Sequence, residues 1–79
     1  MADYRSWLFD WFHQRAPHVV LAPEDNYFNA GAIDSFGVIE LIEDIEQTYV
    51  VRFTQEDFQD RRFSSVAGLA TLLAEKSGA

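Results

Sequence analysis

The 79-residue sequence contains no cysteine, only four glycines and two prolines, and few basic residues. Without cysteine it can form neither a disulfide framework nor a cysteine-ligated metal site, and it has no thiol of its own. The glycines are too scattered to form a phosphate-binding loop. No apolar segment approaches the roughly 20 residues that a membrane span needs. At the N-terminus Arg5 is balanced by Asp3 and no apolar run follows. We therefore expect no signal peptide and a cytoplasmic location.

Negative charge is concentrated in the middle of the sequence. The chain has 6 Lys and Arg residues against 13 Asp and Glu residues, which gives a net charge of −7. Residues 34–60 hold most of these acids but only one base, Arg52, so this segment accounts for the whole net charge. Such a field repels nucleic acids and anionic lipids and attracts basic protein partners. From charge alone, an acidic face that is merely solvated surface is an equal alternative.

Length and composition indicate a single small domain over residues 1–79. Hydrophobic residues make up 48% of the sequence, which is too many for a disordered chain. A first helix is predicted over about residues 3–15, and Pro17 sets its end. Its apolar residues have the spacing of one helical face and are expected in the core: Tyr4, Trp7, Leu8, Trp11 and Phe12. A long loop over residues 16–34 follows, and five of its residues are expected to pack inward: Val19, Val20, Leu21, Tyr27 and Phe28.

A second helix is predicted from Asp34 or Ser35 to about Tyr49. Five positions form its buried stripe: Val38, Leu41, Ile42, Ile45 and Tyr49. Four acids lie on or near the opposite side: Glu40, Glu43, Asp44 and Glu46. Phe36 and Ile39 fall among these acids, away from the stripe. Two large apolar residues within an acidic face indicate a contact surface, although single exposed apolar side chains are normal.

Two further helices complete the predicted fold. Thr54 and Asp57 form an approximate capping box for a short third helix, with Phe53 and Phe58 as a hydrophobic staple. A fourth helix begins at Ser64 or Ser65, runs to Lys76 and is followed by Gly78 as its stop. Its buried stripe is Val66, Leu69, Ala70 and Leu73. The sequence therefore predicts an all-α fold, a small four-helix bundle with a long first loop and a short third helix.

The search for reactive groups leads to Ser35. His13 and His18 flank Pro17 in a poor geometry for sharing a metal ion, and no metal site is predicted. As a nucleophile Ser35 has no visible base and is not bracketed by glycines, which argues against a small hydrolase. A phosphate ester on Ser35 would instead meet the free N–H groups and positive dipole of the second helix. Asp34 could help to hold a metal ion in a modifying enzyme, or either residue could simply cap the helix.

Residues 26–37, followed by Ile39-Glu40-Leu41-Ile42 and Ile45-Glu46, resemble acyl carrier proteins. The resemblance covers nearly the whole chain, including the long loop, the Asp-Ser pair and Phe63-Ser64-Ser65-Val66. In this family the serine that matches Ser35 carries 4′-phosphopantetheine, and its thiol holds acyl or aminoacyl groups as thioesters. Fatty-acid carriers usually read Asp-Ser-Leu-Asp, whereas residues 34–37 read Asp-Ser-Phe-Gly, which is similar to D-alanyl and other free-standing aminoacyl carriers.

The resemblance implies a carrier and not an enzyme. Its cofactor would be 4′-phosphopantetheine on Ser35, beside Asp34. The implied partners are a phosphopantetheinyl transferase, an adenylating acyl or aminoacyl ligase and a downstream acyltransferase. We expect these partners to contact Phe36, Ile39, Glu40 and Glu43. The chain begins at Met1 and ends soon after the fourth helix, so we expect a free-standing monomer.

Two questions stay open at this stage. The cargo of such a carrier could be an aminoacyl, fatty acyl or hydroxyacyl group. The chain could also be an unmodified acidic helical protein-interaction module. That module would share the acidic face but would not require Ser35.

Overall fold

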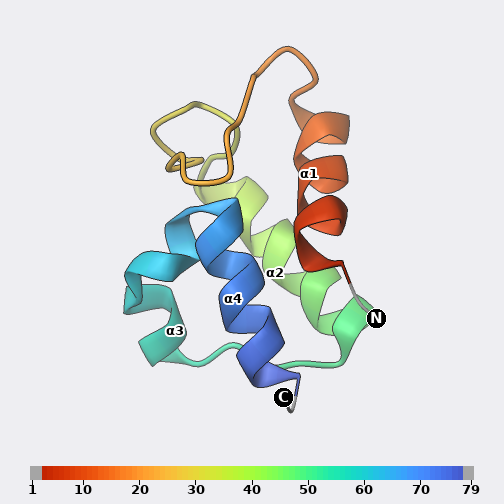
Figure 1. The fold of residues 1–79 in the computed structure, drawn as a ribbon, viewed down its shortest axis with the longest axis vertical. Helices are drawn as coiled ribbons and strands as arrows, with labels where there is room; N and C mark the ends of the chain where they lie inside the picture. Colours follow the sequence, from red (N-terminus) through yellow and green to blue (C-terminus); the bar gives the residue numbers. More distant parts are fainter. Residues whose placement is uncertain (1–2, 78–79) are drawn as a thin grey trace.

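The computed structural model describes residues 3–77, and its regular elements over this range are helices. They are α1 (Tyr4–Arg15), α2 (Ser35–Tyr49), α3 (Gln55–Gln59) and α4 (Val66–Lys76), with a 3₁₀ turn, η1 (Arg61–Ser64), before α4. Figure 1 shows α1, α2 and α4 side by side, with the shorter α3 set to one side. The predicted all-α fold, with its long first loop and short third helix, is confirmed.

Each α-helix is preceded by a residue whose side chain accepts a hydrogen bond from a backbone N–H of the first turn. The four caps are Asp3, Asp34, Thr54 and Ser65. At α3 the predicted capping box is complete, because Asp57 Oδ2 also accepts from the Thr54 backbone N–H at 2.7 Å. Such caps satisfy N–H groups that have no partner within the helix. Gly78, the predicted stop of α4, lies outside the described residues.

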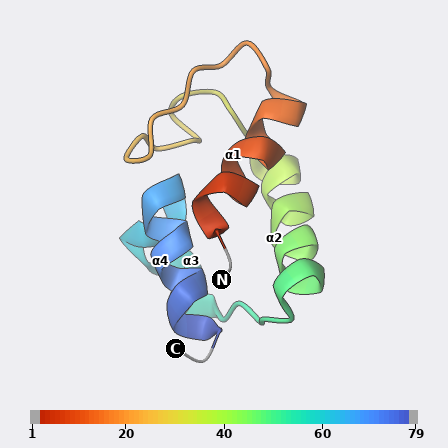
Figure 2. The same ribbon diagram turned by 45° about the vertical axis from the view of Figure 1, so that its right-hand side comes forward.

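Helices α1 and α2 pack against each other in antiparallel directions, as Figure 2 shows. Near the start of α1, the Trp7 ring packs edge-on against the ring of Tyr49, at the end of α2, with their centroids 5.7 Å apart. At the other end, the Arg15 guanidinium lies 2.8 Å from the Glu40 carboxylate. The last turn of α1 therefore lies beside the first turns of α2.

The core is formed where α1, α2 and α4 meet. Leu8, Leu41, Ile45, Leu69 and Leu73 are all completely buried. The predicted stripes are confirmed, although Val38, Ile42 and Tyr49 at the edges of the α2 stripe, and Tyr4 and Trp7 on α1, are only partly buried. Most of the aromatic residues of α1 thus serve packing, as their spacing predicted.

The long loop is attached to the start of α4. Its Tyr27 N–H donates to the Ser64 carbonyl at 3.1 Å, and the Pro23 carbonyl accepts from the Ala67 N–H at 2.8 Å. The Tyr27 side chain is completely buried. Two hydrogen bonds and the buried Tyr27 side chain thus hold in place a loop that has no helix of its own.

Two loop residues are more exposed than predicted. Val20 is 94% exposed, although Val19 and Leu21 on either side of it are partly buried. Neighbouring side chains of an extended segment point in opposite directions, so three consecutive residues cannot all face the core. Phe28 is 39% exposed because it sits in a turn in which the Asn26 side chain accepts from its N–H at 2.9 Å. The expectation that Val20 and Phe28 pack inward was wrong.

The segment that joins α3 to α4 is more ordered than its sequence indicated. η1 places Phe63 in the core, where its ring meets the ring of Phe58 at 5.3 Å between centroids. The predicted staple is present, with the Phe53 and Phe58 rings stacked at 6.1 Å. Gly68 allows α4 to approach η1, because a Cβ on Gly68 would lie 2.3 Å from the Arg62 carbonyl oxygen. No side chain fits at that position without moving backbone.

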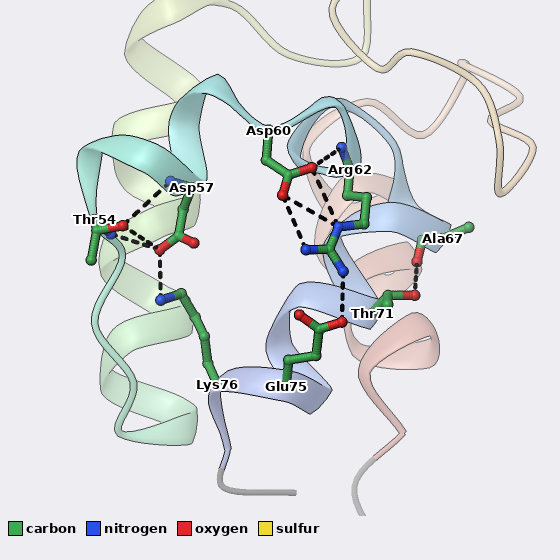
Figure 3. A network of polar contacts seen from close by, with 8 residues as sticks. All are labelled: Thr54, Asp57, Asp60, Arg62, Ala67, Thr71, Glu75 and Lys76. Atoms are coloured by element: carbon green, nitrogen blue, oxygen red, sulfur yellow. Dashed lines mark hydrogen bonds and ion pairs between the residues drawn. The ribbon is translucent and has the colours of Figure 1, made fainter.

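Ion pairs reinforce this end of the molecule (Figure 3). The Lys76 ammonium lies 2.6 Å from the Asp57 carboxylate, and Arg62 bridges Asp60 at 3.0 Å and Glu75 at 2.7 Å. Partial burial opposes ionisation of Asp57, but its hydrogen bonds from Lys76 and Thr54 outweigh this effect and lower its pKa below the ordinary value. Hydrogen bonds from Arg62 lower the pKa of Asp60 as well.

Candidate functional site

Ser35 is the first residue of α2 and is exposed to solvent. The cap of this helix is Asp34, whose Oδ1 accepts from the Gly37 N–H at 2.7 Å. Of the two capping residues that the sequence allowed, the structure therefore selects Asp34. The Ser35 hydroxyl is left available at the positive end of the α2 dipole, where an attached phosphate would be stabilised.

The loop before Ser35 is shaped by two tight turns. Asn26 accepts through its side chain from the Asn29 N–H at 3.1 Å, and through its carbonyl from the Ala30 N–H at 2.9 Å. Gly31 has φ +77°, a left-handed conformation that favours glycine. The Ala32 N–H then donates to the Tyr27 carbonyl at 3.0 Å. These contacts direct the chain from the buried Tyr27 into the start of α2.

Phe36 and Ile39 lie on the surface close to Ser35 in the sequence. Phe36 is 79% exposed and Ile39 is 55% exposed, as their positions off the buried stripe predicted. Both belong to the helix that begins at Ser35, so they lie within its first turns. Large apolar side chains at such exposure lose water contact only when another surface covers them. Their role as a partner contact stays a prediction.

The acids of α2 divide into two groups. Glu40 and Glu43 are exposed, and Glu40 forms the surface ion pair with Arg15. Asp44 is half-buried, and its Oδ2 accepts from the Trp11 indole N–H at 2.8 Å. Glu46 is half-buried too, and it accepts from the Phe53 backbone N–H at 3.1 Å.

The four acids that were predicted on or near the outer side of α2 therefore differ in their contacts, and Asp44 and Glu46 are not free surface charges. Both lie on the flanks of the helix, where α1 and the segment before α3 offer N–H donors. Their carboxylates hold neighbouring elements in place. Of the four acids, Glu40 and Glu43 are the two that remain exposed on this helix.

A cleft of about 490 Å³ lies beside the start of α2. The last turn of α1, the loop and the first turn of α2 all contribute to it, and it is lined by Trp11, Arg15, Ala16, His18, Gly31, Ala32, Ile33, Asp34 and Gly37. Asp34 and Gly37 are among its lining residues, whereas Ser35 is not. No local pattern in the sequence indicated this cleft, because its walls come together only through tertiary packing.

Residues 3–77 contain no group of three or more His, Asp or Glu side chains arranged to hold a metal ion. Over the same residues, the helices are too short or too polar to span a bilayer.

The surroundings of Ser35 fit 4′-phosphopantetheine. Ser35 is exposed, and the helix cap is provided by the neighbouring Asp34. Such a group would be held through Ser35 Oγ and would supply a thiol that the chain itself lacks.

The family model described as a phosphopantetheine attachment site matches residues 14–73, which is most of the chain. No curated protein and no solved structure matches the chain. The matched region includes the long loop, α2, α3, η1 and most of α4. The chain therefore belongs to the family of phosphopantetheine-binding carrier proteins, which hold cargo on covalently attached 4′-phosphopantetheine and are not themselves enzymes.

Proposed function

We propose that this carrier holds an acyl or aminoacyl cargo as a thioester on 4′-phosphopantetheine attached to Ser35. The observation that carries the proposal is the exposed Ser35 hydroxyl, at the first residue of α2 and next to the Asp34 cap. In attachment, Ser35 Oγ forms a phosphodiester bond with the pantetheine phosphate of coenzyme A. The pyrophosphate bond breaks, adenosine 3′,5′-bisphosphate leaves, and the serine proton is taken up by a base of the transferase. Asp34 supports the reaction by fixing the start of the helix.

In the later steps the carrier keeps the cargo tethered. A cargo on a flexible arm reaches each partner at a high effective concentration, without a binding pocket of its own. The catalytic partners are a phosphopantetheinyl transferase, an adenylating acyl or aminoacyl ligase, and an acyltransferase that removes the cargo. A monomer in the cytoplasm stays the expectation from the sequence.

An aminoacyl cargo is favoured by the residues around Ser35. The Asp-Ser-Phe-Gly sequence is similar to that of aminoacyl carriers. A Cβ at Gly37 would lie 2.9 Å from Ile33 Cγ1 and 3.2 Å from Asp34 Oδ1. The aspartate that fatty-acid carriers usually have here would therefore crowd both the cap and the Ile33 side chain. Charging with a panel of adenylating enzymes and their acids would identify the cargo.

The partner face proposed for α2 consists of Phe36, Ile39, Glu40 and Glu43. Exposed apolar side chains supply the contact, and the acids steer basic partners toward it. The Glu40 carboxylate is paired with the Arg15 guanidinium, which offsets its charge. Glu43 is therefore the stronger candidate for long-range attraction of basic partners. These contacts would be brief, because one carrier must serve several enzymes in turn.

The attachment is tested by intact-mass measurement. The wild-type protein, Ser35→Ala and the control Ser6→Ala are each incubated with a broad-specificity transferase and coenzyme A. Ser6 is an exposed serine on α1, so its removal should leave attachment unchanged. We expect the wild type and Ser6→Ala to gain the arm and Ser35→Ala to stay unmodified. A wild type that never gains the arm would favour the unmodified interaction module, and a modified Ser35→Ala protein would place the arm elsewhere.

A further inference from the structure

Arg15 places a positive charge beside the acidic first turns of α2. It lies in the last turn of α1, and its guanidinium nitrogens are 2.8 Å from the Glu40 carboxylate and 3.8 Å from the Asp44 carboxylate. The other paired bases, Arg62 and Lys76, contact acids of the α3–α4 region. Within residues 3–77, Arg15 is therefore the one base that forms ion pairs with acids of α2.

The contacts of Arg15 follow from the antiparallel packing of α1 and α2. Trp11 and Arg15 are four residues apart on α1, and Glu40 and Asp44 are four residues apart on α2, so each pair lies on one face of its helix. Because the helices run in opposite directions, Trp11 meets Asp44 while Arg15 meets Glu40. The Arg15 guanidinium also lies 4.3 Å from the centroid of the Trp11 ring, whose face attracts a cation. Three neighbours thus hold the Arg15 charge over the start of α2.

The two acids of the proposed partner face consequently differ. Glu40 lies against a cation, whereas Glu43 forms no ion pair within residues 3–77. The side chains of Arg15 and Glu40 are 43% and 55% exposed, and ion pairs with this exposure contribute little to stability. The main physical effect of Arg15 is therefore on the electrostatic field that an approaching molecule meets at the start of α2.

We propose that Arg15 is a specificity-determining residue that lowers the rate at which basic partners associate with α2. The inference rests on the proposed function, in which a phosphopantetheinyl transferase with a basic contact surface must bind beside Ser35 before it attaches the arm. The positive charge of Arg15 offsets the attraction of Glu40, so Glu43 supplies most of the remaining steering. A partner that presents an acid opposite Arg15 escapes this penalty. Arg15 thereby discriminates between partners by charge and keeps the complexes with basic partners brief.

The rate of arm attachment tests the role of Arg15. Unmodified protein is incubated with coenzyme A and a transferase that has a basic contact surface, and kcat and KM are measured at low and at high salt. Arg15→Gln is compared with Arg5→Gln, which removes the same charge from the exposed first turn of α1, at the end of the helix away from Ser35.

We expect Arg15→Gln to raise kcat/KM by about two- to fivefold at low salt, through KM and not kcat, because the substitution changes docking and not chemistry. Arg5→Gln should have a clearly smaller effect, because its charge lies far from the partner face. The difference between the two variants should disappear at high salt, where exposed charges are screened.

Two further variants separate the charge of Arg15 from its packing. Arg15→Lys keeps the cation but loses the planar guanidinium, so it should keep kcat/KM close to that of the wild type. Arg15→Gln combined with Glu40→Gln removes both charges and should return kcat/KM toward the wild-type value. Equal effects of Arg15→Gln and Arg5→Gln, or slower attachment to Arg15→Gln, would refute this role of Arg15 and leave the proposed function standing. If the mass shows that the wild type never gains the arm, both proposals fail.

Discussion

The two ends of this small bundle use their polar side chains differently. At the α3–α4 end, which comprises α3, η1 and the facing part of α4, Asp57, Asp60, Arg62 and Lys76 pair with one another or with neighbours. At the attachment end, which comprises residues 26–34 and the first turns of α2, Ser35, Phe36 and Ile39 are exposed. The first end is locked by internal contacts, and the second offers its side chains to other molecules. The comparison indicates that substitutions at the α3–α4 end act on stability, whereas those at the attachment end act on function.

The largest expected difference is between two isoleucines of α2. Ile45 is completely buried and Ile39 is 55% exposed. Ile45→Ala should destabilise the protein by about 2–5 kcal/mol, because it leaves a cavity in the core. Ile39→Ala should change stability by less than about 0.5 kcal/mol and should slow loading by partner enzymes. Urea denaturation together with rates of arm attachment measures both effects. Equal destabilisation by the two variants would refute the division of α2 into an inner and an outer face.

Two glycines give the next comparison, one from each end. Gly68→Ala should destabilise the protein by about 1–3 kcal/mol, because its Cβ meets the backbone of Arg62. Gly37→Ala meets side-chain atoms of Ile33 and of the cap and no backbone, and alanine favours helix, so its effect should stay within about 1 kcal/mol. Thermal unfolding of both variants checks this order. A Gly37→Ala protein that is less stable than Gly68→Ala would show that the attachment end is the more tightly packed of the two.

The loop of the attachment end contains one buried group without a partner. The Tyr27 hydroxyl makes no hydrogen bond to any residue in the described range, and burial raises its pKa above the ordinary value. Tyr27→Phe removes this unsatisfied hydroxyl and should stabilise the protein by about 1 kcal/mol. The control Tyr4→Phe loses a surface hydrogen bond to Ser77 Oγ and should have little effect. Denaturation midpoints compare the variants, and a loss of stability in Tyr27→Phe would reveal a partner for its hydroxyl.

The smallest expected effect is the pH dependence of the Asp57–Lys76 pair. Folding lowers the pKa of Asp57, so the folded state favours its ionised form. This contribution is fully present above the pKa of Asp57 in the unfolded chain, about 4, and is lost as the pH falls through the lower folded value. Asp57→Asn should therefore cost about 1 kcal/mol or less at neutral pH, and the cost should shrink in acid. Glu56→Gln, an exposed neighbour, is the control. A cost of Asp57→Asn that is constant down to acid pH would exclude the ion pair as its source.

The sequence alone determined the four α-helices, and their starts to within one residue. Asp34, Thr54 with Asp57, and Ser65 cap helices through contacts within three residues, and apolar spacing depends only on the geometry of a single helix. The same local rules predicted the exposure of Phe36 and Ile39 and the place of Ser35 at the start of α2. Such features could be predicted because both partners of each contact are close together in the chain.

Tertiary structure decided the rest. Asp44 meets Trp11 across 33 positions, Glu40 meets Arg15 from another helix, and Gly68 is needed only because η1 lies against α4. The cleft at the start of α2 likewise depends on how the loop packs between α1 and α2. These contacts join residues that no local pattern relates, since their distance is set by the packing of whole helices. The sequence could therefore point to Ser35 as the attachment residue that we propose, whereas only the folded chain shows which residues surround the start of α2.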